Sequence, residues 1–162
     1  MIVLALAFGF PAAAEVRFSE PADEVRNVVD RIAERLELMQ SVAVWKYAKA
    51  VAVTDVAREE EVLGATLRQA QRLGMDPQAA RELFVLQIGL ARKIQQHYLD
   101  EWNAQGGSGQ SVRDLDSDLR PALDRIGARM LQGISTSLPE FERTDFAAQY
   151  GPLAARIRTA EV

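Results

Sequence analysis

Two basic residues, Arg35 and Lys46, stand eleven positions apart in a stretch whose apolar residues recur at three- and four-residue steps. At about 100° per residue, that spacing places both side chains nearly in line on one face of a helix. Met39 and Val42 lie between them on the same line, so two cations flank an apolar seam. Either residue alone is explained as a long side chain that lies along the edge of a core and keeps its charge in water. As a pair, they also fit the wall of a pocket that binds an anion.

A later predicted helix carries two glutamines on its apolar face, Gln87 and Gln95, beside Ile88, Ala91 and Tyr98. A buried amide needs hydrogen-bond partners, because leaving it without them costs stability. Those partners can come from the protein itself or from a bound ligand, and the sequence leaves both possibilities open.

Asp55, Arg58 and Glu59 stand together where another helix is expected to begin. On their own they read as a capping acid followed by a solvated, charged face. Combined with the cations and the glutamines, they indicate a water-poor pocket between helices, lined by several cations and a neutral amide. Such a pocket suits a small dianion, and the pattern adds no obvious nucleophile, histidine base or metal cluster to it.

The elements that position these residues are helices, because helical periodicity covers almost everything after residue 20 and no useful strand-like alternation occurs. Capping residues, glycine and proline divide the chain. The predicted helices span Asp23 to about Lys49, Thr54 or Asp55 to about Leu73, Pro77 to beyond Trp102, and about Ser117 to Ser137, with two short ones flanking Pro139 and Gly151-Pro152 and a flexible loop at 106–111. We therefore predict an all-α, single-domain helical bundle of about six helices.

Composition narrows the function classes. The chain has 162 residues and a net charge of −4 with acids and bases interspersed, so a single domain is expected and nucleic acid is an unsuitable partner. It has no cysteine, which removes disulfides, thiolate metal ligands and cysteine nucleophiles together. Its single histidine, His97, cannot build a histidine-rich metal site, and a lone histidine on a helix is usually a surface residue. We expect neither a metal nor a cofactor.

Residues 1–14 are apolar, carry no charge and end in three alanines before Glu15. The run is shorter than the ~20 residues that cross a bilayer, and its end resembles a signal-peptide cleavage site. A buried N-terminal helix is the alternative, although Pro11 argues against it. We predict a signal peptide over residues 1–14, a domain over residues 15–162, and a periplasmic or secreted mature protein that is not in the membrane.

Four phrases of the sequence, in order, resemble the exported gamma subgroup of the AroQ-class chorismate mutases. They are AERLELMQSVAVWK at 33–46, TDVAREEEVL at 54–63, GMDP with LFVLQIGLARKIQ between 74 and 95, and LRPALDRIGARML at 119–131. The resemblance covers about residues 25–135 with preserved spacing. It implies that family's helical fold and the rearrangement of chorismate to prephenate, a step of aromatic amino acid biosynthesis in the shikimate pathway, with no cofactor.

The resemblance also implies roles for individual residues. Arg35 and Arg120 match the arginines that bind the two carboxylates of the substrate. Lys46 and Gln95 match the residues that donate hydrogen bonds to the ether oxygen of the breaking C–O bond. Arg120 is in the same chain as the rest, whereas cytosolic relatives take one site arginine from a partner chain. The resemblance therefore implies a homodimer in which each chain has a complete site.

The remaining matches are less uniform. Arg58 matches an arginine that helps to hold a carboxylate, and Asp55 and Glu59 match acids that approach the substrate hydroxyl in some relatives. Ala91 stands where relatives often have a polar residue, and Val62 stands near another such position. One carboxylate contact is therefore missing or supplied elsewhere.

A non-catalytic helical module, either an anion-binding protein or an interaction protein derived from a mutase, is the alternative. Retention of Arg35, Lys46, Arg58, Gln95 and Arg120 together argues against it, because a decayed site should have lost at least one of these side chains.

Overall fold

The computed structural model describes residues 21–142, 144–145, 147–148 and 150–152. The predicted signal peptide at 1–14 lies outside this part of the chain. Within it, the regular structure is helical and no strand occurs, as the sequence predicts. Five helical elements have assigned bounds there, close to the six expected: α1 (Pro21–Lys49), α2 (Val56–Arg72), α3 (Pro77–Gln105), the π-helical turn η1 (Leu115–Leu119) and α4 (Arg120–Phe141).

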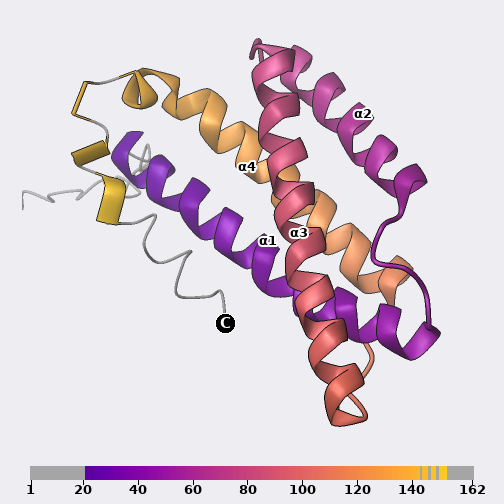
Figure 1. The fold of residues 1–162 in the computed structure, drawn as a ribbon. Helices are drawn as coiled ribbons and strands as arrows, with labels where there is room; N and C mark the ends of the chain where they lie inside the picture. Colours follow the sequence, from indigo (N-terminus) through magenta and orange to yellow (C-terminus); the bar gives the residue numbers. More distant parts are fainter. Residues whose placement is uncertain (1–20, 143, 146, 149, 153–162) are drawn as a thin grey trace, which may run out of the picture.

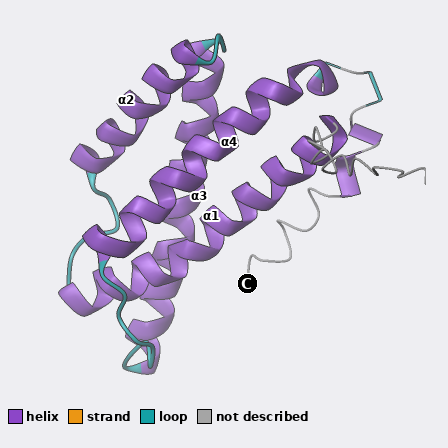
Figure 2. Cartoon of the chain, turned by 180° about the vertical axis from the view of Figure 1, so that it is seen from behind, coloured by secondary structure: helices purple, strands orange, loops and turns teal. Residues whose placement is uncertain are grey.

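Two long helices form the base of the bundle. α1 and α4 lie side by side, and α3 crosses them with α2 packed beside it (Figures 1 and 2). α2 also contacts α4, and η1 contacts both α1 and α4. Segments far apart in the sequence therefore meet where the four α-helices approach one another.

Local sequence signals set the ends of the helices near this meeting point. After α1, Ala50 adopts a left-handed backbone conformation (φ 52°), and the chain turns toward α2. Of the two caps expected for α2, Asp55 is the one used, because its side chain accepts a hydrogen bond from the backbone nitrogen of Arg58 at 3.1 Å. Asp76 caps α3 and Pro77 fills its first turn, as predicted.

The last helix differs from its prediction at both ends. The Asp114 side chain caps the helical segment by accepting from the Ser117 nitrogen at 2.7 Å, and the segment begins at Leu115 as a π-turn rather than at Ser117. At the other end, α4 continues through Pro139 to Phe141 instead of stopping at Ser137. A proline removes one helical hydrogen bond, and in a final turn little helix remains beyond it to be disrupted.

Three groups of buried apolar side chains form the core. One of them, called the middle core group below, joins Met39 and Val42 of α1 to Ala91 of α3 and to Leu115 and Leu119 of η1. The apolar seam of α1 therefore packs where the helices cross. None of the described helices combines the length and the apolar character that a membrane crossing requires.

Candidate active site

A pocket opens where α1, α2, α3 and the η1–α4 segment meet. It contains about 640 Å³ of empty space, its open mouth included. The structure brings all seven residues to which the resemblance gives a role to the wall of this one pocket: Arg35, Lys46, Asp55, Arg58, Glu59, Gln95 and Arg120. Apolar side chains of the middle core group, among them Met39, Val42 and Leu115, form the rest of its floor.

The two cations of α1 are buried. Arg35 is 6% exposed and Lys46 is 8% exposed, and both face the pocket with Met39 and Val42 between them. The spacing of eleven residues thus places them on one face, as predicted from the helical repeat. Burial decides between the two readings of this pattern, because a side chain that kept its charge in bulk water would be much more exposed.

Arg35 has little from the protein to pair with. One of its terminal nitrogens donates to the Leu123 carbonyl oxygen at 3.4 Å, and its Nε finds no hydrogen-bond partner among the described residues. Its guanidinium also lies over the ring of Phe84, 5.8 Å from the centroid. Burial lowers the pKa of Arg35, partly offset by the charge of Asp124, yet a guanidinium keeps its proton in proteins. A buried cation with free donor capacity can bind an anion strongly.

Lys46 is held by the loop that follows α1. Its Nζ donates to the backbone oxygen of Val53, which the turn after α1 brings back over the lysine. Burial lowers the pKa of Lys46, and the nearby carboxylates of Asp55 and Glu59 partly offset that effect. The ammonium group has two further hydrogens, so it can also donate into the pocket.

The two glutamines of α3 have different surroundings. Gln95 lines the pocket at 6% exposure; its Nε2 lies 3.3 Å from the sulfur of Met39, and its Oε1 has no partner in the described structure. A thioether is a weak acceptor, so little holds this amide in its present rotation. Gln87 is buried at 3% but does not line the pocket, and its Oε1 is also unsatisfied among the described residues.

Arg120 enters the pocket already paired with carboxylates. It donates to Asp116 at 2.6 Å and to Asp55 at 3.0 Å, so the cap of α2 is tied to the first residue of α4. Arg58 likewise donates to Asp124 and, at 3.3 Å, to Glu61. These ion pairs fix the two arginines against the pocket wall, and both are only partly exposed.

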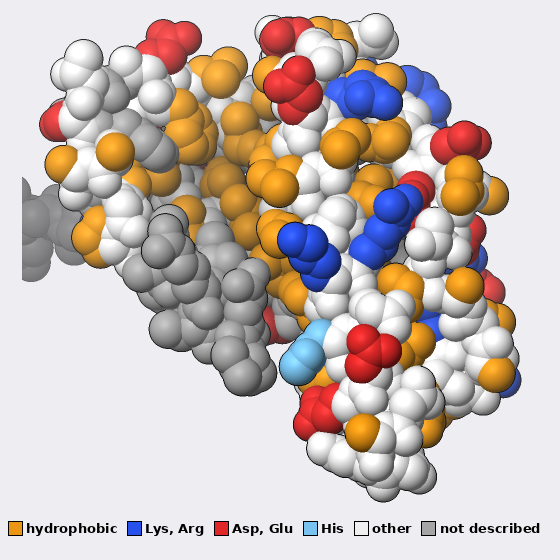
Figure 3. Space-filling model, in the orientation of Figure 1, with side chains coloured by type: hydrophobic (Ala, Val, Ile, Leu, Met, Phe, Trp, Pro, Cys, Tyr) orange, Lys and Arg blue, Asp and Glu red, His pale blue; other side chains and the backbone are white. Residues whose placement is uncertain are grey.

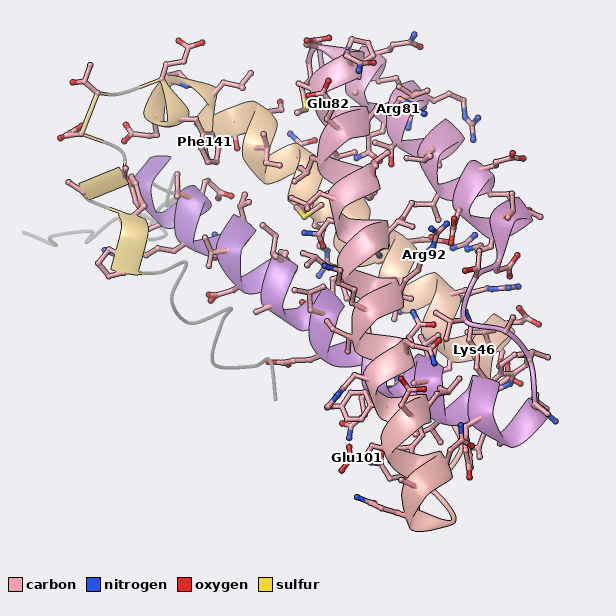
Figure 4. All side chains as sticks on the ribbon, in the orientation of Figure 1. Lys46, Arg81, Glu82, Arg92, Glu101 and Phe141 are labelled. Carbon is pink, nitrogen blue, oxygen red and sulfur yellow. The ribbon has the colours of Figure 1, made fainter. Side chains whose placement is uncertain are left out.

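Arg92 is a pocket residue that the sequence reasoning missed. It reaches from α3 toward α2 (Figure 4), where its Nε donates to Glu59 Oε1 at 2.8 Å and a terminal nitrogen donates to Oε2. A signal was present, because Arg92 follows Ile88 by four residues and precedes Gln95 by three, which places all three on one helical face.

The charge balance of the pocket is positive. Five basic and two acidic side chains line it, and basic groups are visible among apolar ones on this side of the molecule (Figure 3). At Ala91 and Val62 the resemblance implies a polar side chain. In this chain the two residues are apolar parts of the pocket wall. The arrangement can hold a small dianion in an apolar cleft and direct donors at an oxygen atom within it.

Comparisons by sequence point to one group of enzymes. A family model described as "Chorismate mutase type II" matches residues 26–96. A secreted chorismate mutase of Yersinia pestis is 31% identical over 138 residues, which cover 85% of this chain and 72% of that protein. A secreted chorismate mutase of Mycolicibacterium smegmatis is 25% identical over 121 residues, covering 75% of this chain and 67% of that protein.

Comparisons by structure agree with this. A crystal structure of chorismate mutase from Burkholderia thailandensis superposes with a TM-score of 0.78 at 27% identity, covering 85% of this chain and 87% of that one. The Burkholderia phymatum enzyme superposes equally well, with a TM-score of 0.78 over 86% of this chain and 85% of that one. At 24% identity, this second likeness establishes the fold alone.

Proposed function

The chain belongs to the chorismate mutase family, and from this premise we propose that the pocket between its four helices is where it converts chorismate to prephenate. The reaction is a [3,3]-sigmatropic rearrangement, in which a C–O bond breaks while a C–C bond forms. It needs no proton transfer and no covalent intermediate, so this isomerase must fold the substrate into a reactive pose and stabilise charge building on the ether oxygen. The non-catalytic alternative is not favoured.

The observation that carries the proposal is the state of Arg35. It is buried on the pocket wall, has an unsatisfied Nε among the described residues, and contacts no carboxylate there. A carboxylate of chorismate supplies the missing acceptor. It can accept two parallel hydrogen bonds from the guanidinium, the bidentate geometry that arginine favours. Arg35 is therefore the principal anchor of the substrate.

Lys46 and Gln95 are assigned to the ether oxygen. Both are buried, and they line the pocket from two different helices, α1 and α3. A preorganised donor of this kind contributes about 2.7–4 kcal/mol in other enzymes. Two donors and an orientational contribution together reach the ~8 kcal/mol that a millionfold acceleration requires.

Arg120 and Arg58 are also assigned to the substrate carboxylates, but they differ from Arg35 in being paired within the protein. Each already has acidic partners, so each shares its donors between those partners and the substrate. Asp55 and Glu59, which line the same wall, are placed to accept a hydrogen bond from the substrate hydroxyl. This assignment supplies both carboxylates, the ether oxygen and the hydroxyl with partners.

The site requires nothing from a second chain, because all seven assigned residues line one pocket of one protomer. We extend the proposal to a homodimer in which each protomer is active by itself. Specific activity should then stay constant when the protein is diluted below the concentration at which the dimer dissociates. A fall in activity that follows dissociation would show that the site is completed across the interface.

Export is part of the proposal, supported by the secreted relatives and by the apolar residues 1–14. The mature domain is then 15–162. Intact-mass measurement on protein recovered outside the cytoplasm of its host tests this, and a mass that still includes Met1 would rule out cleavage.

Alanine variants test the assignment. Arg35→Ala, Lys46→Ala and Arg120→Ala should each lose at least ~100-fold in kcat/KM, the cost of removing one preorganised donor. Arg81→Ala, which removes an exposed cation of α3 outside the pocket, is the matched control and should retain full activity. Helical circular dichroism should be unchanged throughout. A pocket variant with near-full activity would remove that residue from the site, and melted helices would assign it a structural role instead.

A further inference from the structure

The two acidic residues of the pocket differ in burial. The side chain of Glu59 is 19% exposed, whereas that of Asp55 is 41% exposed. Glu59 therefore places the more desolvated negative charge on the wall of a pocket whose proposed ligand is a dianion. A carboxylate in that position repels such a ligand unless a cation neutralises it.

Arg92 supplies that cation with a defined geometry. Two of its nitrogens donate to the two oxygens of Glu59, so the pair is bidentate and joins α2 to α3. The arginine is the more exposed partner, with 44% of its side chain accessible. The arginine is thus the solvent-facing member of the pair, and both residues line the pocket.

We propose that Arg92 is a positioning residue, which clamps Glu59 against the pocket wall and cancels its charge so that a dianionic substrate can approach. This rests on the proposed function of the pocket. Arg92 acts through Glu59, and it needs no contact with the substrate to do so. Its loss should therefore weaken substrate binding more than it slows the chemical step.

The clamp predicts a specific pattern of kinetics. Arg92→Ala should raise KM about tenfold and change kcat less than about twofold, as expected when one charge on a partly exposed site is uncovered. Because this effect is electrostatic between partly solvated groups, it should shrink as salt is added. Arg92→Lys keeps the charge but loses the bidentate geometry, and it should recover most of the KM.

The decisive experiment is a double-mutant cycle between positions 92 and 59. In the Glu59→Gln background no carboxylate remains to be clamped, so the part of the effect that passes through Glu59 is absent, and adding Arg92→Ala should raise KM clearly less than it does in the wild-type background. Lys93→Ala and Glu60→Gln form the control cycle, since both are exposed neighbours outside the pocket, and they should show no coupling. Melting temperatures of all variants verify that they are folded.

The other outcomes overturn the inference. If Arg92→Ala raises KM equally in both backgrounds, Arg92 acts on the substrate directly and not through Glu59. If KM does not change, or if the loss falls on kcat, the pair does not have this role. The proposed function is tested separately by Arg35→Ala: an inactive Arg35→Ala with no coupling at 92 and 59 overturns this inference alone.

Discussion

At the scale of single residues, the polar groups of the pocket differ in how far the protein satisfies them. Arg58, Arg92 and Arg120 each contact at least one carboxylate of their own chain. Arg35 and Gln95 do not, and each has a buried atom without a partner in the described structure. An unsatisfied buried group costs about 1–3 kcal/mol. The free Nε of Arg35 is a donor, so a substrate carboxylate can recover that cost on binding, and Arg35 is the pocket residue that most needs a substrate.

Gln95 offers a test through pH. An amide donates a hydrogen at every ordinary pH, whereas a carboxylic acid donates one only while protonated. The wild type should therefore have a level kcat/KM from mildly acidic to neutral pH. Gln95→Glu should be active at acidic pH and fail as pH rises through the pKa of the new carboxyl. Rate profiles of both forms check this, and parallel flat profiles would show that residue 95 does not touch the reacting oxygen.

Lys46 gives the complementary prediction at alkaline pH. Burial lowers its pKa, so it loses its proton at a lower pH than an ordinary lysine, whose pKa is about 10.4. Since the charged form is the one that donates to the ether oxygen, kcat/KM should fall as pH rises through that lowered pKa. Lys46→Arg, whose side chain stays charged, should show no such decline in the activity it retains. A wild-type profile that stays level up to about pH 10.4 would contradict the assignment.

At the scale of elements, the site depends on how closely α1 and α4 approach. Gly133 of α4 faces Val28 of α1, and a Cβ added to the glycine would lie 2.8 Å from the Val28 Cγ2 atom. A branched valine side chain has few other rotamers into which to move. The lack of a side chain at Gly133 therefore sets the spacing of the two helices, one of which carries Arg35 and the other Arg120.

Alanine substitutions separate this packing effect from helix propensity. Gly133→Ala should lower stability, because overpacking costs about 1–3 kcal/mol and outweighs the ~0.5–1 kcal/mol that alanine gains over glycine in a helix. Gly89→Ala in α3 is the matched control, since nothing lies within 4 Å of its added Cβ, and it should be neutral or stabilising. Thermal unfolding measures both. Equal Tm shifts for the two variants would mean that α1 and α4 move apart freely.

Most of the element-level structure could be predicted from local signals. Asp76 as the capping residue and Pro77 in the first turn mark the start of α3 in the sequence. The helical repeat aligns Arg35 with Lys46. The pairing of Arg92 with Glu59 could not be predicted, because it depends on how two helices pack rather than on either sequence alone. The sequence did not predict that α4 continues through Pro139, because proline usually marks the end of a helix. In the last turn a proline disrupts little, so the helix can continue past it.

At the scale of the whole molecule, the bundle assembles a site from parts that are distant in the sequence. Arg35 of α1, Gln95 of α3 and Arg120 of α4 reach one pocket because α3 crosses the α1–α4 pair at that point (Figure 1). The apolar floor lowers the local dielectric, which strengthens the attraction between these cations and a bound anion. The fold thus provides preorganised charge, which is what a rearrangement without proton transfer requires.

The most direct test of this account is the loss of the ultraviolet absorbance of chorismate on addition of the purified protein, dialysed against a chelator. We expect chorismate to disappear with an equal yield of prephenate, at an undiminished rate after dialysis, and to persist when Arg35→Ala replaces the wild type. Persistence of chorismate with folded wild-type protein would contradict the central claim, because a complete and preorganised pocket would then have no catalytic effect.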